Sequence, residues 1–267
     1  MRTRGLVVAV LLATLTLVTG CAQSVDPIER LGKKAAERVH GSRPGVPAGT
    51  TGTTGRTGPP AGTTGTTGAT PVPPYPPVLD RVPTSDRVVF LTYDDGAERD
   101  PRFIDLVREL RLPVSMFLTD SVVGPGYGHF ARLQSVGANL QNHTLHHAAL
   151  RGLPYAGQRA EICGQQDKLR SRFGRRPRFF RPPYGTYDAT TLRAAADCGV
   201  SAVVLWRAAM TPGGLVYPRG SHHLLPGDIV AMDSDEAGGP TLKDRTVRVL
   251  REARERGLTV GRLEDYL

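Results

Sequence analysis

The amino-acid sequence predicts an α/β fold, an irregular (β/α) barrel of about seven strands preceded by a disordered tether. Two observations support this prediction. From about residue 79 to residue 267, short apolar runs alternate with segments of helical periodicity. Such alternation is typical of a parallel sheet whose strands are joined by crossover helices. From residue 41 to residue 77, Gly, Thr and Pro dominate, and such a composition has almost nothing apolar to bury.

The expected elements follow from the apolar patterns. Strands are expected at residues 87–92, 114–118, 139–142, 178–181, 200–206, 229–232 and 258–263. Helices are expected at residues 101–110, 129–135, 155–173, 188–198 and 242–256. About seven strand–helix units suit an irregular barrel better than a compact open sheet. In such a barrel the chemistry lies at the carboxyl ends of the strands.

The first twenty residues have the pattern of an export signal. Arg2 and Arg4 precede an almost unbroken apolar run from Gly5 to Val18, which is short for a membrane span. The run leads through small residues into Cys21, which resembles a bacterial lipobox. We therefore expect a lipoprotein signal peptide at residues 1–20, lipidation of Cys21, and an extracytoplasmic protein anchored to the bacterial membrane. An ordinary secretory signal is the alternative, and it also exports the domain.

The rest of the chain divides into a tether and one domain. Residues 21–78 form the Gly/Thr/Pro-rich tether, in which residues 48–55 recur as residues 61–68. Residues 79–267 form the domain. A flexible tether allows a membrane-fixed domain to reach substrate in the cell wall.

Charge and cysteine content narrow the choice of partners. The formal net charge is +9, from 34 basic and 25 acidic residues. Because the protein is expected to be exported, nucleic acid is not an expected partner. Anionic lipid headgroups or wall polymers are expected instead, and a merely solvated basic surface stays open. Cys163 and Cys198 remain after Cys21, either as a disulfide or as two buried thiols.

Three short motifs carry side chains suited to hydrolytic chemistry. Asp94 and Asp95 directly follow the first expected strand, although an Asp-Gly pair alone is also a common turn. His143 and His147 would lie one turn apart if the chain is helical there. Two imidazoles and one carboxylate can hold a metal with a position left open for water. Arg181 begins a third motif, Arg-Pro-Pro-Tyr-Gly, whose prolines restrict the backbone.

In this order and spacing, the motifs Thr-Tyr-Asp-Asp-Gly, His-Thr-Leu-His-His and Arg-Pro-Pro-Tyr-Gly resemble those of the polysaccharide deacetylase family (NodB homology, carbohydrate esterase family 4). The resemblance covers about residues 87–267. It implies that Asp95, His143 and His147 bind a divalent metal, typically zinc. It also implies that Asp94 is the general base, that Arg181 orients Asp94, and that the backbone N–H of Tyr184 stabilises the oxyanion. The implied reaction is removal of an N-acetyl group from a glycan.

Two further motifs of the family are degenerate in this sequence. Residues 205–210 contain no acid where the family has an aspartate, and Asp233 stands where the family has a histidine that protonates the leaving amine. An ordinary aspartate, with a pKa near 3.9, is protonated in only about one molecule in a thousand at neutral pH. His222 and His223 in the preceding loop are alternative donors.

Three functional hypotheses follow. The first is a zinc-dependent N-deacetylase that acts on an N-acetylglucosamine-containing glycan, most naturally peptidoglycan. The second is a catalytically impaired protein that keeps the metal and binds the glycan. The third is an O-acetyl esterase, whose leaving group needs no strong acid. Esterase activity without amidase activity distinguishes the third from the first, and metal binding without either activity indicates the second.

Overall fold

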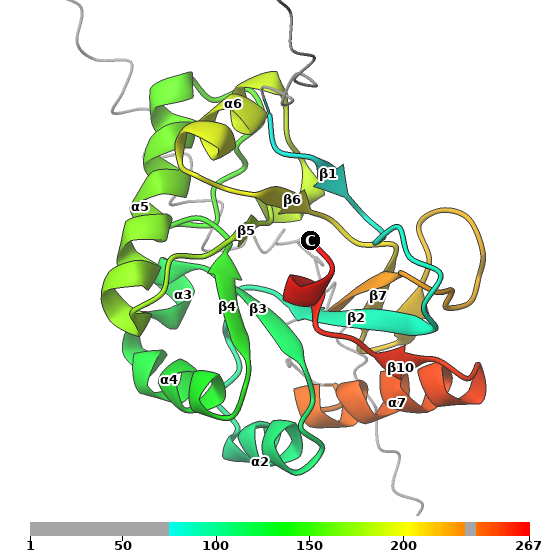
Figure 1. The fold of residues 1–267 in the computed structure, drawn as a ribbon. Helices are drawn as coiled ribbons and strands as arrows, with labels where there is room; N and C mark the ends of the chain where they lie inside the picture. The colour runs from blue at the N-terminus through cyan, green and yellow to red at the C-terminus, as the bar shows by residue number, and fades with distance from the viewer. Residues whose placement is uncertain (1–74, 233–238) are drawn as a thin grey trace, which may run out of the picture. The chain divides into compact units, whose positions relative to one another are not determined.

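In the computed structural model, residues 75–232 and 239–267 are described, and they form a curled sheet with helices on its outer side (Figure 1). The sheet of this part of the chain has ten strands. Their bounds are β1 Val78–Leu79, β2 Val88–Tyr93, β3 Val114–Leu118, β4 Asn139–Asn142, β5 Phe179–Phe180, β6 Ala202–Val204, β7 Ala208–Thr211, β8 Gly214–Val216, β9 Ile229–Met232 and β10 Thr259–Val260.

The strand order is that of an open half-barrel. Along the sheet it runs β1-β6-β5-β4-β3-β2-β9-β7-β8, and β10 pairs with β2. All of these pairings are parallel except β7 with β8. The predicted irregular barrel is therefore confirmed, as a curled mixed sheet. All seven expected strands are present, and β1, β7 and β8 are added to them.

Side chains cap the start of some of the helices. Asp100 accepts a hydrogen bond from the backbone of Arg102 at the start of α2, and Asp188 forms a capping box with Thr191 at the start of α6. The α-helices are α2 Pro101–Glu109, α3 Asp120–Val123, α4 Tyr127–Ser135, α5 Tyr155–Phe173, α6 Ala189–Asp197 and α7 Leu242–Glu255. Among the described residues, no helix is both long enough and apolar enough to cross a membrane.

Side-chain alternation along β2 separates the two faces of the sheet. Val89, Leu91 and Tyr93 pack outward in the core shared with α2, α4 and α7. Phe90 packs inward in a second core cluster, which includes Phe117 of β3. Because successive strand residues point to opposite faces, the inward row of β2 continues through Thr92 towards the strand's carboxyl end.

The C-terminal segment closes the amino-terminal end of the half-barrel. The carboxylate of Glu264 accepts hydrogen bonds from Ser115 at 2.9 Å, Asn139 at 3.0 Å and Gln141 at 2.9 Å. Leu263 beside it is buried in the inner core. These contacts fill the amino-terminal end, and the polar groups considered below lie at the carboxyl end.

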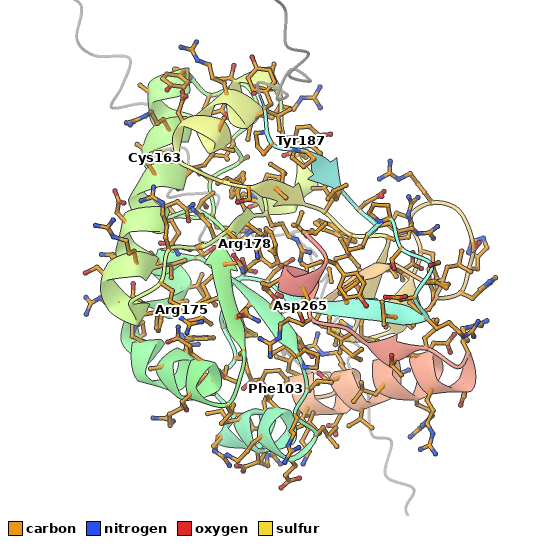
Figure 2. All side chains as sticks on the ribbon, viewed as in Figure 1. Phe103, Cys163, Arg175, Arg178, Tyr187 and Asp265 are labelled. Carbon is orange, nitrogen blue, oxygen red and sulfur yellow. A yellow bond between two sulfur atoms is a disulfide. The ribbon has the colours of Figure 1, made fainter. Side chains whose placement is uncertain are left out.

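Three local features go beyond the sequence prediction. Val78 of β1 lies in the segment expected to be tether, and it pairs with β6. The β7–β8 hairpin turns at Pro212 and Gly213, a residue pair that favours turns, but we had not expected strands beside it. Cys163 (labelled in Figure 2) forms a disulfide with Cys198, which decides the open choice between a disulfide and free thiols. Cys21, the signal peptide, almost all of the tether and Asp233 lie outside the described residues.

Candidate active site

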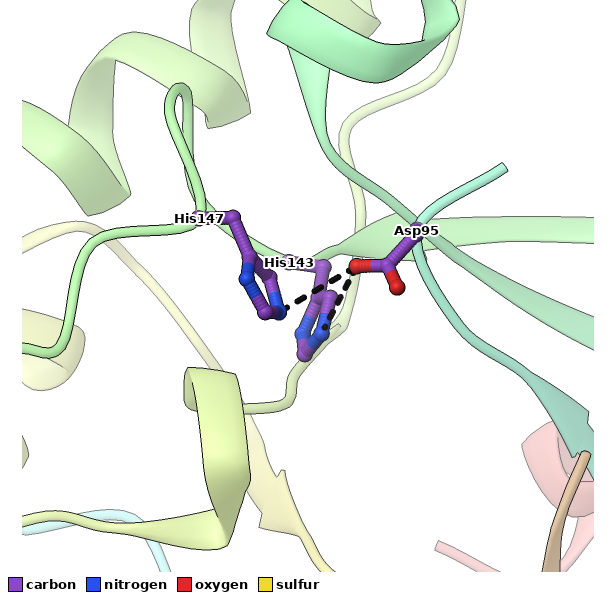
Figure 3. Close-up of side chains that lie close together, drawn as sticks. All are labelled: Asp95, His143 and His147. Carbon is purple, nitrogen blue, oxygen red and sulfur yellow. Dashed lines mark ion pairs between the residues drawn. The ribbon is translucent and has the colours of Figure 1, made fainter. Parts of the chain in front are cut away.

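The carboxyl ends of three parallel strands place the predicted site residues side by side. Asp94 and Asp95 follow β2, His143 follows β4 and Arg181 follows β5. Since β2, β3, β4 and β5 are parallel neighbours, their carboxyl ends lie along one edge of the sheet. His147 reaches the same place from the loop after β4 (Figure 3).

Asp95, His143 and His147 form a compact group of potential metal ligands. One Asp95 oxygen lies 3.5 Å from Nε2 of His143 and 3.2 Å from Nε2 of His147. One ligand atom from each residue lies within 4.8 Å of those of the other two. Figure 3 shows both imidazoles directed toward this carboxylate. Asp95 has a φ of 63°, so its backbone lies in the left-handed region that Asp tolerates better than most residues.

The hydrogen bond made by His143 prepares its ring for a metal. Its Nδ1 lies 2.7 Å from the backbone carbonyl oxygen of Arg181. A carbonyl oxygen only accepts, so Nδ1 carries the proton and Nε2 presents a lone pair toward Asp95. The ring is buried, and the hydroxyl of Thr119 donates to the His143 carbonyl at 2.9 Å. Both contacts restrict the orientation of this side chain.

The two histidines are not on a helix, so the helical arrangement considered from their spacing is wrong. Thr144 and His147 have φ values of 75° and 55°, which a right-handed helix excludes. The side chain of Asn142 accepts from the backbone of Thr144, and the hydroxyl of Thr144 accepts from the backbone of His147. These local bonds replace helical ones and fold the loop tightly. The imidazole centroids are 4.9 Å apart.

The donor set fits a divalent metal such as zinc. Two imidazole nitrogens and one carboxylate oxygen are ligands that zinc accepts, and three protein ligands leave a coordination position open. The fixed tautomer of His143 is the arrangement that metal-binding histidines commonly have. We therefore regard the Asp95–His143–His147 group as able to hold the ion.

Asp94 is held by a buried arginine. Nη1 of Arg181 lies 2.6 Å from a carboxylate oxygen of Asp94, and the Arg181 side chain is wholly buried. Its other nitrogens donate to the hydroxyl of Thr92 at 2.8 Å and to the carbonyls of Val204 and Leu205 at 3.0 Å and 3.1 Å. Burial lowers the pKa of the Arg181 guanidinium, and the neighbouring Asp94 carboxylate opposes that effect.

Tyr184 and Gly185 form a turn that approaches the site. Tyr184 has a φ of 60°, its side chain is exposed, and its ring lies 4.8 Å from that of His147. A side chain at Gly185 would place its Cβ 2.9 Å from the ring of Trp206, so the close approach requires glycine. The turn therefore brings the Tyr184 ring to the rim of the site.

Several contacts of the site were not predicted from the sequence. Thr92 binds the guanidinium of Arg181, and Trp206 and Phe117 lie against it with ring centroids 5.4 Å and 4.4 Å from its central carbon. The alternation along β2 could have identified Thr92 as inward-facing. His222 and His223, the alternative proton donors, lie in the loop that leads to the amino-terminal end of β9.

Sequence comparison shows which known proteins this chain is similar to. The family model described as polysaccharide deacetylase matches residues 81–203. An uncharacterized protein of Streptomyces coelicolor is 66% identical over 192 residues, which cover 72% of this chain and 77% of the relative. A chitooligosaccharide deacetylase of Bradyrhizobium is 29% identical over 120 residues, which cover 44% of this chain and 55% of that protein.

A solved structure shares the architecture. A peptidoglycan N-acetylglucosamine deacetylase superimposes with a TM-score of 0.61 at 20% identity, over 72% of this chain and 93% of that chain. At this identity the likeness concerns the fold. The half-barrel of this chain carries an Asp-His-His group and an Arg-paired aspartate at its carboxyl edge. Residues 81–203 therefore resemble the polysaccharide deacetylase family.

Proposed function

We propose that this protein is a divalent-metal-dependent N-deacetylase that releases acetate from N-acetylglucosamine units of peptidoglycan. The observation that carries the proposal is the meeting of two groups at one sheet edge. These groups are the Asp95–His143–His147 ligand set and the Asp94–Arg181 pair. The peptidoglycan substrate is inferred from the predicted lipid anchor at Cys21 and the tether, which restrict the domain to the cell envelope.

Each residue then has a distinct task. Asp95, His143 and His147 would hold the metal, which lowers the pKa of bound water and polarises a carbonyl when present. Asp94 acts as general base and takes a proton from the attacking water. Arg181 keeps the Asp94 carboxylate in place, at 2.6 Å. The backbone N–H of Tyr184 donates to the oxyanion that forms on the acetyl carbonyl.

The departing amine needs a proton, and the group that donates this proton affects the rate of amide hydrolysis. Asp233 occupies the position at which the family that this sequence resembles has a histidine. A well-placed general acid contributes about 10²–10⁴-fold to the rate, so we expect a slow amidase. The same feature favours a second candidate function, O-acetyl ester hydrolysis, because an alkoxide leaves more readily than an amide nitrogen.

Acetate release from three substrates tests the proposal. The chain from residue 21 onward, with Cys21→Ala to prevent lipidation, is stripped of metal and reloaded with zinc. It is then given N-acetylglucosamine oligomers, peptidoglycan and an O-acetylated glycan. We expect release from the first two substrates, and loss of this release in Asp95→Ala.

Asp233→His is a second variant, measured with the same three substrates. Activity on N-acetyl groups that appears only in Asp233→His would mean that the natural chain is an impaired enzyme retained for glycan binding. Activity on the O-acetylated glycan alone would replace the proposal with the esterase. No activity in either protein, with zinc bound, would refute both enzymatic readings.

A further inference from the structure

A cluster of arginines lies at the sheet edge opposite the candidate site. Because the strands are parallel, residues that precede them share the amino-terminal edge, whereas Asp94, His143 and Arg181 follow strands at the other edge. The last turn of α5 and the segment that joins it to β5 contain five exposed arginines, which we call the arginine patch. Its members are Arg170, Arg172, Arg175, Arg176 and Arg178.

Much of the charge of the arginine patch is not compensated. Arg176 pairs with Asp167 at 3.3 Å. Arg178 donates to the backbone oxygens of Glu264, at 2.9 Å, and Leu267. Among the ion pairs of the described residues, none includes Arg170, Arg172 or Arg175. Figure 2 labels Arg175 by the end of α5 and Arg178 nearer the C-terminal segment that carries Asp265.

Two other arginines of this edge have carboxylate partners. Arg256 pairs with Glu252 at 2.6 Å, and Arg262 pairs with Asp265 at 3.9 Å. The arginine patch is therefore a concentration of positive charge at this edge. Guanidinium groups match phosphate oxygens in geometry and charge, so a phosphate-bearing surface is the complementary partner.

An apolar hollow at the same edge favours a lipid surface over a soluble polyanion. Leu110, which lies between α2 and β3, is 54% exposed. Around it are apolar side chains with two arginines among them: Leu112, Leu250, Leu258, Arg111 and Arg254. Apolar groups edged by basic ones suit the boundary between headgroups and acyl chains, whereas a soluble polymer has nothing to place against them.

The chain also enters the domain at this edge. β1 is parallel to β6, so Val78 lies at the amino-terminal end of the sheet, and the segment of residues 21–77 precedes it in the chain. That segment carries the predicted lipid site at Cys21. We propose that the arginine patch binds anionic phospholipid headgroups and so docks the domain with its candidate site facing away from the membrane. This inference rests on the proposed anchoring and is independent of the deacetylase activity.

Vesicle binding without the lipid anchor tests the docking. The chain from residue 21 onward carrying Cys21→Ala is mixed with vesicles of phosphatidylcholine and phosphatidylglycerol, or of phosphatidylcholine alone, and sedimented. We expect binding only to the anionic vesicles. A basic residue near an anionic surface contributes roughly fivefold to partitioning, so Arg170→Gln, Arg172→Gln and Arg175→Gln together should weaken it about 100-fold.

A variant of equal charge change controls for net charge. Arg151→Gln, Arg159→Gln and Arg193→Gln remove three other exposed arginines, and binding should stay within a few fold of the parent. Equal losses in the two triple variants, or no binding by the parent, would overturn the proposal. Binding of soluble polyphosphate, but not of vesicles, would overturn it in favour of a wall polymer. Acetate release from soluble oligomers is measured on every variant, so a failed docking and a failed deacetylase are distinguished.

Discussion

Arg181 donates to Asp94 at 2.6 Å from a position of complete burial, so the proposed general base is held in place from the barrel's interior. The same guanidinium also binds Thr92 and two backbone carbonyls. A buried cation with several fixed acceptors is costly to disturb, because each acceptor left unsatisfied loses a hydrogen bond that water cannot replace.

Arg181→Lys should therefore destabilise the fold and slow any reaction. A lysine ammonium keeps the charge, but it cannot donate hydrogen bonds to the same set of acceptors as the planar guanidinium. We expect the free energy of unfolding to fall by about 2–4 kcal/mol, measured by urea denaturation, with loss of acetate release. Arg159→Lys, at an exposed position, should stay within about 0.5 kcal/mol of the parent. Equal stability of the two variants would contradict the assigned role of Arg181.

Asp94 and Asp95 are adjacent, and the proposed function gives them different tasks that two substitutions can separate. Asp95 lies within 3.5 Å of both histidine nitrogens, whereas Asp94 is paired with Arg181. Asp95→Ala should abolish zinc binding, measured by calorimetry, whereas Asp94→Asn should retain it and lose about 10²–10⁴-fold in rate. Zinc at 100 times its dissociation constant should stabilise the parent and Asp94→Asn by about 2.7 kcal/mol, but not Asp95→Ala. Loss of zinc binding in Asp94→Asn would show that the two roles are not separate.

His129 on α4 should make the fold sensitive to mild acid. Burial, with smaller contributions from Arg99 and Arg132, lowers the pKa of its imidazole to about 4. The unfolded imidazole takes up a proton below its ordinary pKa of about 6.5, and the folded one does so only near 4. Stability is therefore fully present above pH 6.5 and is lost as the pH falls towards 4, by at most about 3 kcal/mol.

Urea denaturation at a series of pH values checks this expectation. His129→Gln should remove this part of the pH dependence, because an amide does not titrate in this range. His222→Gln, at an exposed position, should leave the slope unchanged. A parent and a His129→Gln variant with parallel pH profiles would show that this imidazole does not sense acid.

Several helices and strands were predictable from the sequence because the residues of each segment favour the same secondary structure. The strand 114–118 and the helix 155–173 occur at the predicted residues, as do the strands 139–142 and 229–232. At 114–118 and 229–232, a run of mostly apolar residues carries the pattern. The two-residue strand β1 carries no such pattern, and its place in the sheet depends on its pairing with β6.

The residue types of the candidate metal ligands were predictable from the sequence, but their geometry was not. The residue types at positions 95, 143 and 147 indicate a metal site, and the structure brings them together. Their approach depends on left-handed backbone at Asp95, Thr144 and His147, which spacing alone does not reveal. The choice between a helix and a tight loop was decided by side-chain bonds from Asn142 and Thr144, whose effect appears only in three dimensions.

The Cys163–Cys198 disulfide should stabilise the domain by joining α5 to the end of α6. The two cysteines are 35 residues apart in sequence, and their Cα atoms are 5.0 Å apart. Closing a loop of this length in the unfolded chain removes conformational freedom worth about 3–4 kcal/mol in the entropic description. Cys163→Ser with Cys198→Ser should lower the free energy of unfolding by about this amount, measured by urea denaturation without reductant. Dithiothreitol should destabilise the parent similarly and leave the double variant unchanged. If reductant has no effect on the parent, the pair does not constrain the unfolded chain and the stability of the domain depends on its packed core alone.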